Sequence, residues 1–369
     1  MSSQPAASSS GNQALSRAKS AKQDEFYTQL VDIENELKHY RAQLRGKIIL
    51  CNCDDPYESN FFKYFALNFN ALGLKKLIAT SYAGSTVAGG QLPLPDIEGL
   101  KPEGKEPYAV EINEVPDHNS DGATDLADVE YLLRNDANTC RTLQGDVEYG
   151  AGDFRSEECV AYLKEADVVV TNPPFSLFRE YVAILMEYDK KFVTLGNQNQ
   201  VATDEIADLI TEGKMWQGCY AGDMAFRVPS YYEERETRFW IDKEGQKWRS
   251  LGTACWYTNL DFAKRHERLN LFKKYVPDGY PFYVNYDAIE VSRYTEIPID
   301  FDGLMGVPVT ALSKLSPDQF QIIGFSGNLA RPMAEVVPGQ TGAGRFYLDM
   351  GHGNYKRMYD RVVIRNLQI

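Results

Sequence analysis

The stretch DVVVTNPPFSLFREY, residues 167–181, decides how the rest of the chain is interpreted. It begins with a short apolar run that is typical of a buried strand, and LFREYVAILMEY (177–188) has the spacing of a helix. Asn172-Pro173-Pro174-Phe175 is therefore predicted to form the turn between them. Ligands of open α/β sheets bind at the carboxyl ends of the strands, so this turn stands where a functional site is expected.

The residue types of this turn suit methylation of an amine. An exocyclic amine on a purine ring is a poor nucleophile, because its lone pair is delocalised into the ring. Two acceptors, the Asn172 side-chain oxygen and the Pro173 carbonyl, would favour a more tetrahedral nitrogen, the prolines stiffen the turn, and Phe175 would stack on an extruded base. The alternative is a proline turn that only ends a strand, since four such residues also occur by chance.

Strands and helices alternate on both sides of this turn. Apolar runs predict strands at 47–53 (KIILCNC), 75–82 (KKLIATSY) and 190–197 (KKFVTLGN). Helical spacing is found at 24–45, 60–73, 156–166, 177–188 and 204–213. This alternation predicts an α/β fold with a mostly parallel central sheet.

The chain is divided by changes in composition. Residues 1–22, rich in Ser, Ala and Gln, read as a disordered tail, and 23–215 as the catalytic domain. Within that domain 83–145 reads as an acidic surface insertion, with a helix near LADVEYLLRN (126–135). From residue 216 to 369 the pattern turns to strands, which predicts a β-rich C-terminal region that we expect to recognise DNA.

Charge and cysteine usage narrow the function classes. The net charge of −13 argues against DNA binding. Most of this negative charge lies in residues 94–150, which hold fourteen Asp/Glu against four Lys/Arg. A basic surface elsewhere is therefore compatible with the sequence, and residues 331–369 hold six Lys/Arg against three Asp/Glu. The six cysteines form no CxxC pair and do not cluster with the four histidines, so we expect neither a metal site nor disulfides. With no membrane-length apolar run and no signal peptide, we expect a cytoplasmic protein.

A basic and aromatic segment follows the strand-rich boundary. Residues 227–249 carry six Lys/Arg among Tyr231, Tyr232, Phe239, Trp240 and Trp248, and RFWID-KEG-QKWR reads as a hairpin. Its candidate phosphate or base contacts are Arg235, Arg238, Lys243, Lys247 and Arg249. For any one of them a solvated basic face is an equally good interpretation.

Taken together, these motifs resemble the EcoRI-type family of adenine-specific DNA methyltransferases. The resemblance spans most of the chain after Asp24, and the acidic insertion diverges most. It is carried by DEFYTQ (24–29), CNCDDPYESNFFKYFALNF (51–69), LGLKKLIA (72–79), GDFRS (152–156), DVVVTNPPFSLFREY (167–181), YTNLD (257–261), YDAI (286–289) and MGVPVT (305–310).

The resemblance implies a Rossmann-like methyltransferase fold, S-adenosylmethionine as methyl donor and duplex DNA as substrate, with the target adenine flipped and methylated at N6. It assigns the catalytic roles to Asn172, Pro173, Pro174 and Phe175. The residues that it assigns to cofactor binding are Tyr27, Thr28, Asp55, Asp153 and Phe154. Asp153 would accept from the cofactor's adenine amine and Phe154 would pack on that ring.

Two departures from the general methyltransferase pattern are clear. The glycine-rich loop after the first strand is replaced by Tyr57-Glu58-Ser59-Asn60, and the second strand lacks the usual acidic residue for the ribose. Ser81 or Tyr82 is a weak substitute for that acid.

Other functions are compatible with parts of the sequence. A methyltransferase acting on RNA or on a protein glutamine amide would also use an NPPF-like turn. A DNA-binding protein without catalysis is a third reading, which the intact turn argues against. The resemblance also raises a cognate restriction endonuclease, acting on the same DNA site, as a possible partner.

Overall fold

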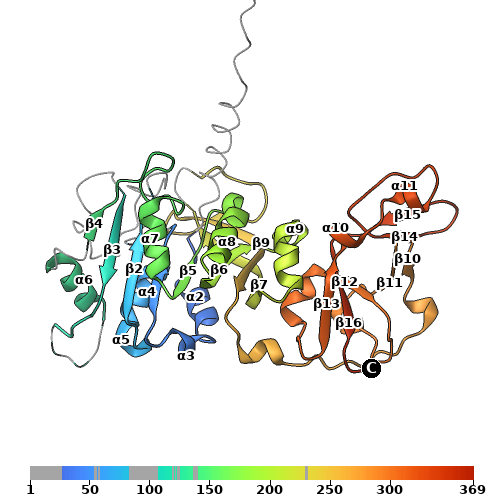
Figure 1. Ribbon diagram of the computed structural model, residues 1–369, viewed down its shortest axis with the longest axis horizontal. Coiled ribbons are helices and arrows are strands. Elements are labelled where there is room, and N and C mark those ends of the chain that lie inside the picture. The colour runs from blue at the N-terminus through green and yellow to red at the C-terminus, as the bar shows by residue number, and fades with distance from the viewer. Residues whose placement is uncertain are drawn as a thin grey trace, which may run out of the picture. The chain divides into compact units, whose positions relative to one another are not determined.

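The computed structural model describes residues 27–53, 56, 59–82, 107–118, 120, 122, 125–135, 140–228 and 232–369. Contacts divide these residues into two compact units (Figure 1). Unit 1 runs to Thr194 and also takes in Met224–Leu251, whereas unit 2 comprises Leu195–Asp223 and Gly252–Ile369. The division therefore differs from the predicted boundary at 215/216. The predicted tail, 1–22, lies outside the described residues.

The centre of unit 1 is a run of parallel strands. These are β1 (Ile48–Cys51), β2 (Lys76–Thr80), β5 (Val168–Thr171) and β6 (Lys191–Asn197). β1 lies between β2 and β5, and β6 pairs with the far side of β5, all in parallel. Every residue of β5 is buried, as its apolar sequence requires for a strand covered on both faces. The strand predictions at these four places are confirmed.

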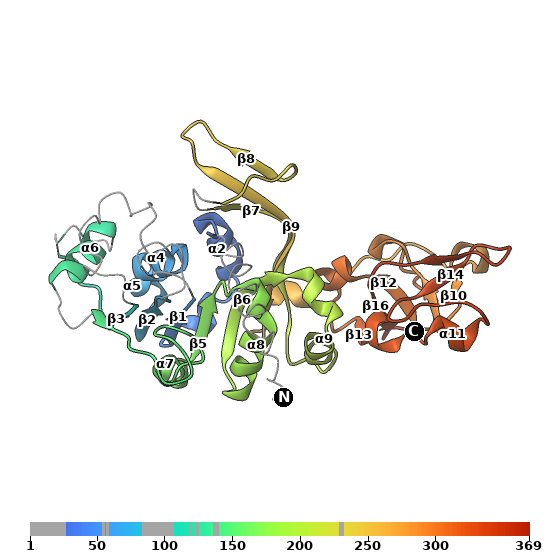
Figure 2. The same ribbon diagram turned by 90° about the horizontal axis from the view of Figure 1, so that it is seen from above.

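Helices connect and cover these strands. Figure 2 shows α4 (Asn60–Leu67) and α5 (Phe69–Leu72) on one face of the sheet, and α7 (Glu157–Glu165) and α8 (Phe178–Glu187) on the other. Hydroxyl caps fix two of the helix starts. Ser59 accepts from the Phe61 N–H at 3.1 Å, and Ser156 accepts from the Cys159 N–H at 3.3 Å.

The predicted helix at 24–45 is interrupted. The described part consists of α2 (Leu30–Leu37) and α3 (Arg41–Leu44). The apolar face is nevertheless as expected, since Ile33, Leu37, Tyr40 and Leu44 are fully buried.

The acidic region is not only a surface insertion, which corrects the prediction for 83–145. It contributes β3 (Tyr108–Ile112), α6 (Leu126–Asn135) and β4 (Cys140–Thr142). β3 pairs antiparallel with β2, and β4 pairs antiparallel with β3, so the sheet becomes mixed at this edge. This strand forms because YAVEI is itself an apolar strand sequence. Four of its five residues are buried despite the acidic sequence around it.

Two long strands carry the chain between the units. They are β7 (Trp216–Arg227) and β9 (Lys247–Thr258), and β8 (Phe239–Ile241) pairs antiparallel with β9, which confirms the predicted hairpin. The nine-stranded sheet has the order β4-β3-β2-β1-β5-β6-β9-β7, with β8 beside β9. No helix in the described parts of the chain is long and apolar enough to cross a membrane.

Unit 2 contains the helix α9 (Asp204–Thr211), two short helices and two further sheets. The short helices are α10 (Ser326–Leu329) and α11 (Met333–Val336). The five-stranded sheet has the order β10-β11-β12-β16-β13, and β14 pairs with β15 alone. The bounds are β10 Phe282–Tyr283, β11 Tyr286–Glu290, β12 Met305–Pro308, β13 Phe320–Phe325, β14 Tyr347–Asp349, β15 Tyr355–Arg357 and β16 Arg361–Asn366.

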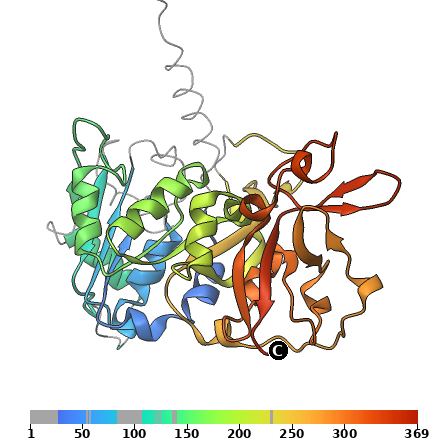
Figure 3. The same ribbon diagram turned by 45° about the vertical axis from the view of Figure 1, so that its right-hand side comes forward.

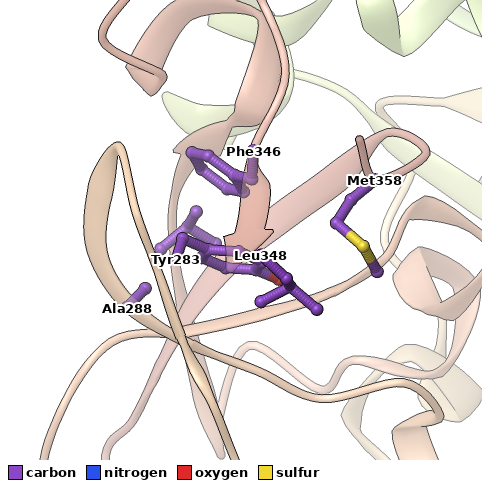
Figure 4. Close-up of a cluster of buried hydrophobic side chains, with 6 residues drawn as sticks. Tyr283, Ala288, Phe346, Leu348 and Met358 are labelled. Carbon is purple, nitrogen blue, oxygen red and sulfur yellow. The ribbon is translucent and has the colours of Figure 1, made fainter. Parts of the chain in front are cut away.

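A buried cluster and an ion pair hold unit 2 together. Figure 4 shows the cluster, in which the rings of Tyr283 and Phe346 stack with centroids 4.5 Å apart. Close to it, Arg361 donates to the Glu290 carboxylate at 2.8 Å, and the Tyr283 hydroxyl donates to the same group. Glu290 and Arg361 are both almost fully buried, so removing either side chain would leave the other as an unpaired buried charge.

Candidate functional site

The Asn172–Phe175 turn leaves the carboxyl end of β5 as the sequence predicts. Asn172 is 6% exposed, Pro173 is buried, and Pro174 and Phe175 are half-buried. The Leu177 N–H donates to the Pro174 carbonyl at 2.9 Å, which closes a single 3₁₀ turn before α8 begins. The turn is thus fixed by the prolines and the helix start, with part of the Phe175 ring reaching the surface.

Asn52, at the end of β1, positions this turn. The Thr171 hydroxyl donates to the Asn52 carbonyl, and the Tyr181 hydroxyl of α8 donates to the Asn52 side-chain oxygen at 2.5 Å. From β6, the Thr194 hydroxyl donates to the Thr171 carbonyl at 3.1 Å. Burial raises the pKa of Tyr181 far above its usual value, so this hydroxyl stays a donor. Sequence reasoning missed Asn52, although its place at a strand end was a signal.

The loop after β1 is strained where other methyltransferases carry glycines. Cys53 has φ = +74°, a left-handed conformation that non-glycine residues rarely adopt. The left-handed conformation therefore falls here on a residue other than glycine. Asp55, the cofactor ligand predicted here, lies outside the described residues, as does Asp54.

The GDFRS segment closes against the end of β2. Gly152 has φ = +76°, and a Cβ atom on it would stand 1.9 Å from the Ser81 carbonyl oxygen. Only glycine allows this approach. Phe154, which follows at 6% exposure, meets the Tyr181 ring edge-to-face with centroids 5.1 Å apart. Tyr181 therefore contacts both Phe154 and Asn52, which joins the GDFRS segment to the Asn172–Phe175 turn.

Asp153 is 7% exposed and bound by a neighbouring arginine. Arg155 donates from Nε to Oδ1 at 2.9 Å and from a terminal nitrogen to Oδ2 at 2.8 Å. Arg155 also pairs with Glu180 of α8 at 3.0 Å. The sequence did not single out Arg155. A carboxylate has about four acceptor positions, so Asp153 keeps acceptor capacity beyond this pair.

Tyr27 and Thr28 lie between α4 and the base of the hairpin. The Tyr27 N–H donates to the Arg227 carbonyl at 3.0 Å, and the Asn60 side chain donates to the Thr28 carbonyl at 2.7 Å. Thr28 is 3% exposed, and its hydroxyl has no hydrogen-bond partner among the described residues. A buried hydroxyl in this condition marks a place where a polar ligand group fits.

The basic hairpin residues fall into two groups. Arg235, Arg238 and Lys243 are exposed. Lys247 instead donates to the Tyr232 carbonyl at 2.9 Å, and Arg249 donates to the carbonyls of Thr237 and Arg238. The two half-buried cations thus hold the loop before β8. Tyr231 lies outside the described residues.

Stacked indoles and an aspartate stiffen the hairpin itself. Trp240 and Trp248 stack with centroids 6.1 Å apart, and the Trp248 indole N–H donates to Asp242 at 2.8 Å. The backbone N–H groups of Glu244 and Gln246 donate to the other oxygen of Asp242. The exposed cations are therefore carried on a rigid support.

The structure brings together part of the predicted site, at one edge of the sheet in unit 1. Contacts link the Asn172–Phe175 turn to Asp153 and Phe154, and Tyr27 and Thr28 lie against the start of α4. Among the described residues, no three His, Cys, Asp or Glu side chains are grouped so that they could hold a metal ion.

Comparison with known proteins gives consistent matches. Residues 14–367 match the family described as adenine-specific methyltransferase EcoRI. The chain is 43% identical to the Type II methyltransferase M.EcoRI of Escherichia coli, over 85% of this chain and 89% of the relative. It is 36% identical to the Type II methyltransferase M.MpnI of Mycoplasma pneumoniae, over 96% and 98%. No solved structure gives a significant match.

The close approach at Gly152 can be tested by substitution. Gly152→Ala should lower the free energy of unfolding by at least about 2 kcal/mol more than Gly46→Ala, measured by urea unfolding. Gly46 has a similar φ of +71°, but its Cβ position has no atom of the described residues within 4 Å beyond its own chain neighbours. It therefore reports the backbone strain without the clash. Equal losses in the two variants would contradict the contact with Ser81.

Proposed function

Since the chain belongs to the EcoRI family of adenine-specific methyltransferases, we propose that it transfers a methyl group from S-adenosylmethionine to N6 of an adenine flipped out of duplex DNA. The enzyme is an adenine-specific DNA methyltransferase. The cofactor, the flipped base and the residue roles are the proposal. The observation that carries it is the buried Asn172 at the carboxyl end of β5, held in place through Thr171 and Asn52.

The strand order of unit 1 supports a Rossmann-like catalytic domain. β2-β1-β5-β6 is a parallel run with connecting helices on both faces. In such sheets ligands bind beyond the carboxyl ends of the strands. Asn52, Ser81 and Asn172 all follow strand ends at that edge.

The residues at this edge fit S-adenosylmethionine. The buried Thr28 hydroxyl offers an unused polar group, Phe154 offers an aromatic ring, and Asp153 offers an acceptor for an adenine amine. Tyr27 and Asp55 complete the proposed set. When bound, the cofactor supplies an electrophilic methyl group on a sulfonium. The protein's part is to hold the accepting nitrogen and to keep it reactive.

Three groups of the Asn172–Phe175 turn act on the adenine. The Asn172 side-chain oxygen and the Pro173 carbonyl accept hydrogen bonds from the N6 amine, which draws its lone pair away from the ring. Phe175, half-exposed on the 3₁₀ turn, stacks on the base. Flipping is required because the amine is paired and shielded in the duplex, and stacking on Phe175 offsets part of the cost of extrusion, roughly a few kcal/mol.

The names of the relatives bear on the biological role of the protein. M.EcoRI, M.MpnI and M.MgeORF184P of Mycoplasma genitalium are each named a Type II methyltransferase. The last is 34% identical over 96% of this chain and 99% of its own length. These names support a role in restriction–modification. A cognate endonuclease that acts on the same DNA site is the partner proposed for it.

The Asn172 role predicts a specific kinetic signature. Asn172→Ala should lower kcat at least about 100-fold while the dissociation constant for S-adenosylmethionine stays within about twofold, because the lost acceptor acts on the transition state. Single-turnover methylation of duplex DNA and calorimetric cofactor titration measure the two quantities. Asn35→Ala, at an exposed site on α2, is the control. Near-normal turnover in Asn172→Ala would rule the mechanism out.

The exposed hairpin cations are predicted to contribute to the salt dependence of DNA binding. Arg235→Ala and Lys243→Ala should each reduce the slope of log Kd against log salt by about one unit, through loss of a phosphate contact. Lys214→Ala should leave the slope unchanged, because Lys214 is exposed but paired with Glu212 at 2.7 Å. Fluorescence anisotropy with duplex DNA gives the slopes. Three slopes equal to that of the wild type would remove the hairpin tip from the interface.

A further inference from the structure

The two-stranded ribbon β14–β15 is firmly mounted in unit 2. Leu348 of β14 and Met358, which follows β15, belong to the buried cluster with Phe346 (Figure 4). Asn285, 2% exposed, accepts from the Tyr347 N–H at 3.0 Å and donates to the carbonyls of Arg331 and Arg345. The ribbon base is therefore held by apolar packing and by a satisfied buried amide.

Beyond this base the ribbon is exposed and compact. Figure 3 shows it extending away from the five-stranded sheet of the same unit. Its tip, Met350–Asn354, contains three successive residues with positive φ, namely Gly351 (+81°), His352 (+54°) and Gly353 (+75°). The Gly351 N–H donates to Asp349 Oδ1 at 2.7 Å, and the Met350 N–H donates to the Asn354 carbonyl at 2.9 Å. The tip therefore has a defined shape that presents His352 and Asn354 to solvent.

The ribbon is cationic in a strongly acidic chain. Residues 350–359 contain Lys356 and Arg357 and no Asp or Glu, while the whole chain has a net charge of −13. Both cations are exposed, and neither forms an ion pair within the described residues. The flanking acids are engaged, since Asp349 caps the tip and Asp360 pairs with Arg345 at 3.0 Å. Lys356 and Arg357 are thus two adjacent exposed cations on β15 that form no ion pair among the described residues.

We propose that the β14–β15 ribbon is a second DNA-contacting element, which enters the major groove of the duplex substrate. The B-DNA major groove, about 12 Å wide and about 8.5 Å deep, admits a two-stranded ribbon. Lys356 and Arg357 are consecutive on a strand, so they point to opposite faces of the ribbon and reach the phosphates on the two walls of the groove. His352 and Asn354 at the tip face the base edges, where an asparagine side chain pairs well with adenine.

The proposal rests on the DNA methyltransferase function, and it assigns sequence reading to residues that this function does not otherwise use. A rigid base, a polar tip and cations on both faces are what groove insertion needs. The exposed hydrophobic side chains of Met350 and Tyr359, which are 60% and 88% exposed, also suit a protein partner or a second copy of the chain. DNA affinity and oligomeric state, measured on the same variants, distinguish these occupants.

The phosphate contacts are tested with the full-length enzyme. Lys356→Gln and Arg357→Gln should each lower the slope of log Kd against log salt for a plasmid-derived duplex by about one unit, without changing cofactor affinity or thermal midpoint. Lys314→Gln is the matched control, an exposed lysine in unit 2 that forms no ion pair within the described residues. Slopes equal to those of the wild type and Lys314→Gln would overturn the assignment.

The base contacts are tested by sequencing. Plasmid DNA from cells expressing the wild type, His352→Ala or Asn354→Ala is read by direct detection of N6-methyladenine. The tip variants should methylate a broader set of sequences, with relaxed preference at one or two positions and an unchanged salt slope. An unchanged set of methylated sequences in both variants would overturn this part.

Oligomeric state and wild-type methylation separate failure of the ribbon assignment from failure of the enzyme function. If the ribbon variants altered only the oligomeric state, measured by light scattering, the ribbon would be a protein interface and the inference would be wrong. If the wild type left plasmid adenines unmodified, the methyltransferase function and this inference would both fall. Wild-type methylation with unaffected ribbon variants would remove the inference alone.

Discussion

The buried side chain and carbonyl of Asn52 form the junction on which the site in unit 1 depends. Asn52 is 4% exposed and accepts from Thr171, at the end of β5, and from Tyr181 of α8. Each hydrogen bond contributes only about 1 kcal/mol net, but loss of either would leave a buried polar group unsatisfied at greater cost. Asn172 directly follows Thr171, and Phe154 packs on Tyr181. One amide therefore fixes the Asn172–Phe175 turn relative to the proposed cofactor residues.

The proposed chemistry is compatible with an acidic protein that acts on a polyanion. As proposed, it uses neutral groups at the strand ends, an amide and a proline carbonyl, so it needs no positive cleft of its own. The cations lie on hairpins instead, at Arg235 and Lys243 in unit 1 and at Lys356 and Arg357 in unit 2. Tyr27, one of the proposed cofactor residues, donates its N–H to the Arg227 carbonyl at the end of β7. DNA contacts and methyl transfer are thus assigned to separate elements.

Local sequence patterns predicted most strands and helices. The features that the sequence did not predict depend on contacts between residues far apart in the chain. The apolar runs indicated the parallel strands, and RFWID-KEG-QKWR indicated the β8–β9 hairpin, because each signal lies within a few residues. The acidic count over 94–150 concealed the strand Tyr108–Ile112, since charge averages over a window hide a short apolar strand. The roles of Asn52 and Arg155 were not predicted from the sequence, because these roles depend on burial and on partners that only the folded structure shows. The split between exposed Lys243 and carbonyl-bound Lys247 likewise depends on loop geometry.

The most direct test of the proposed chemistry is product analysis with labelled cofactor. The protein is incubated with tritium-methyl S-adenosylmethionine and unmethylated duplex DNA, and the DNA is then digested to nucleosides and separated. We expect the label in N6-methyldeoxyadenosine, and its loss when Asn172→Ala replaces the wild type. A contrary result would be no label in N6-methyldeoxyadenosine and label instead in methylcytosine, in RNA added as competitor or in protein. It would contradict the assignment of Asn172, Pro173 and Phe175 to an adenine amine.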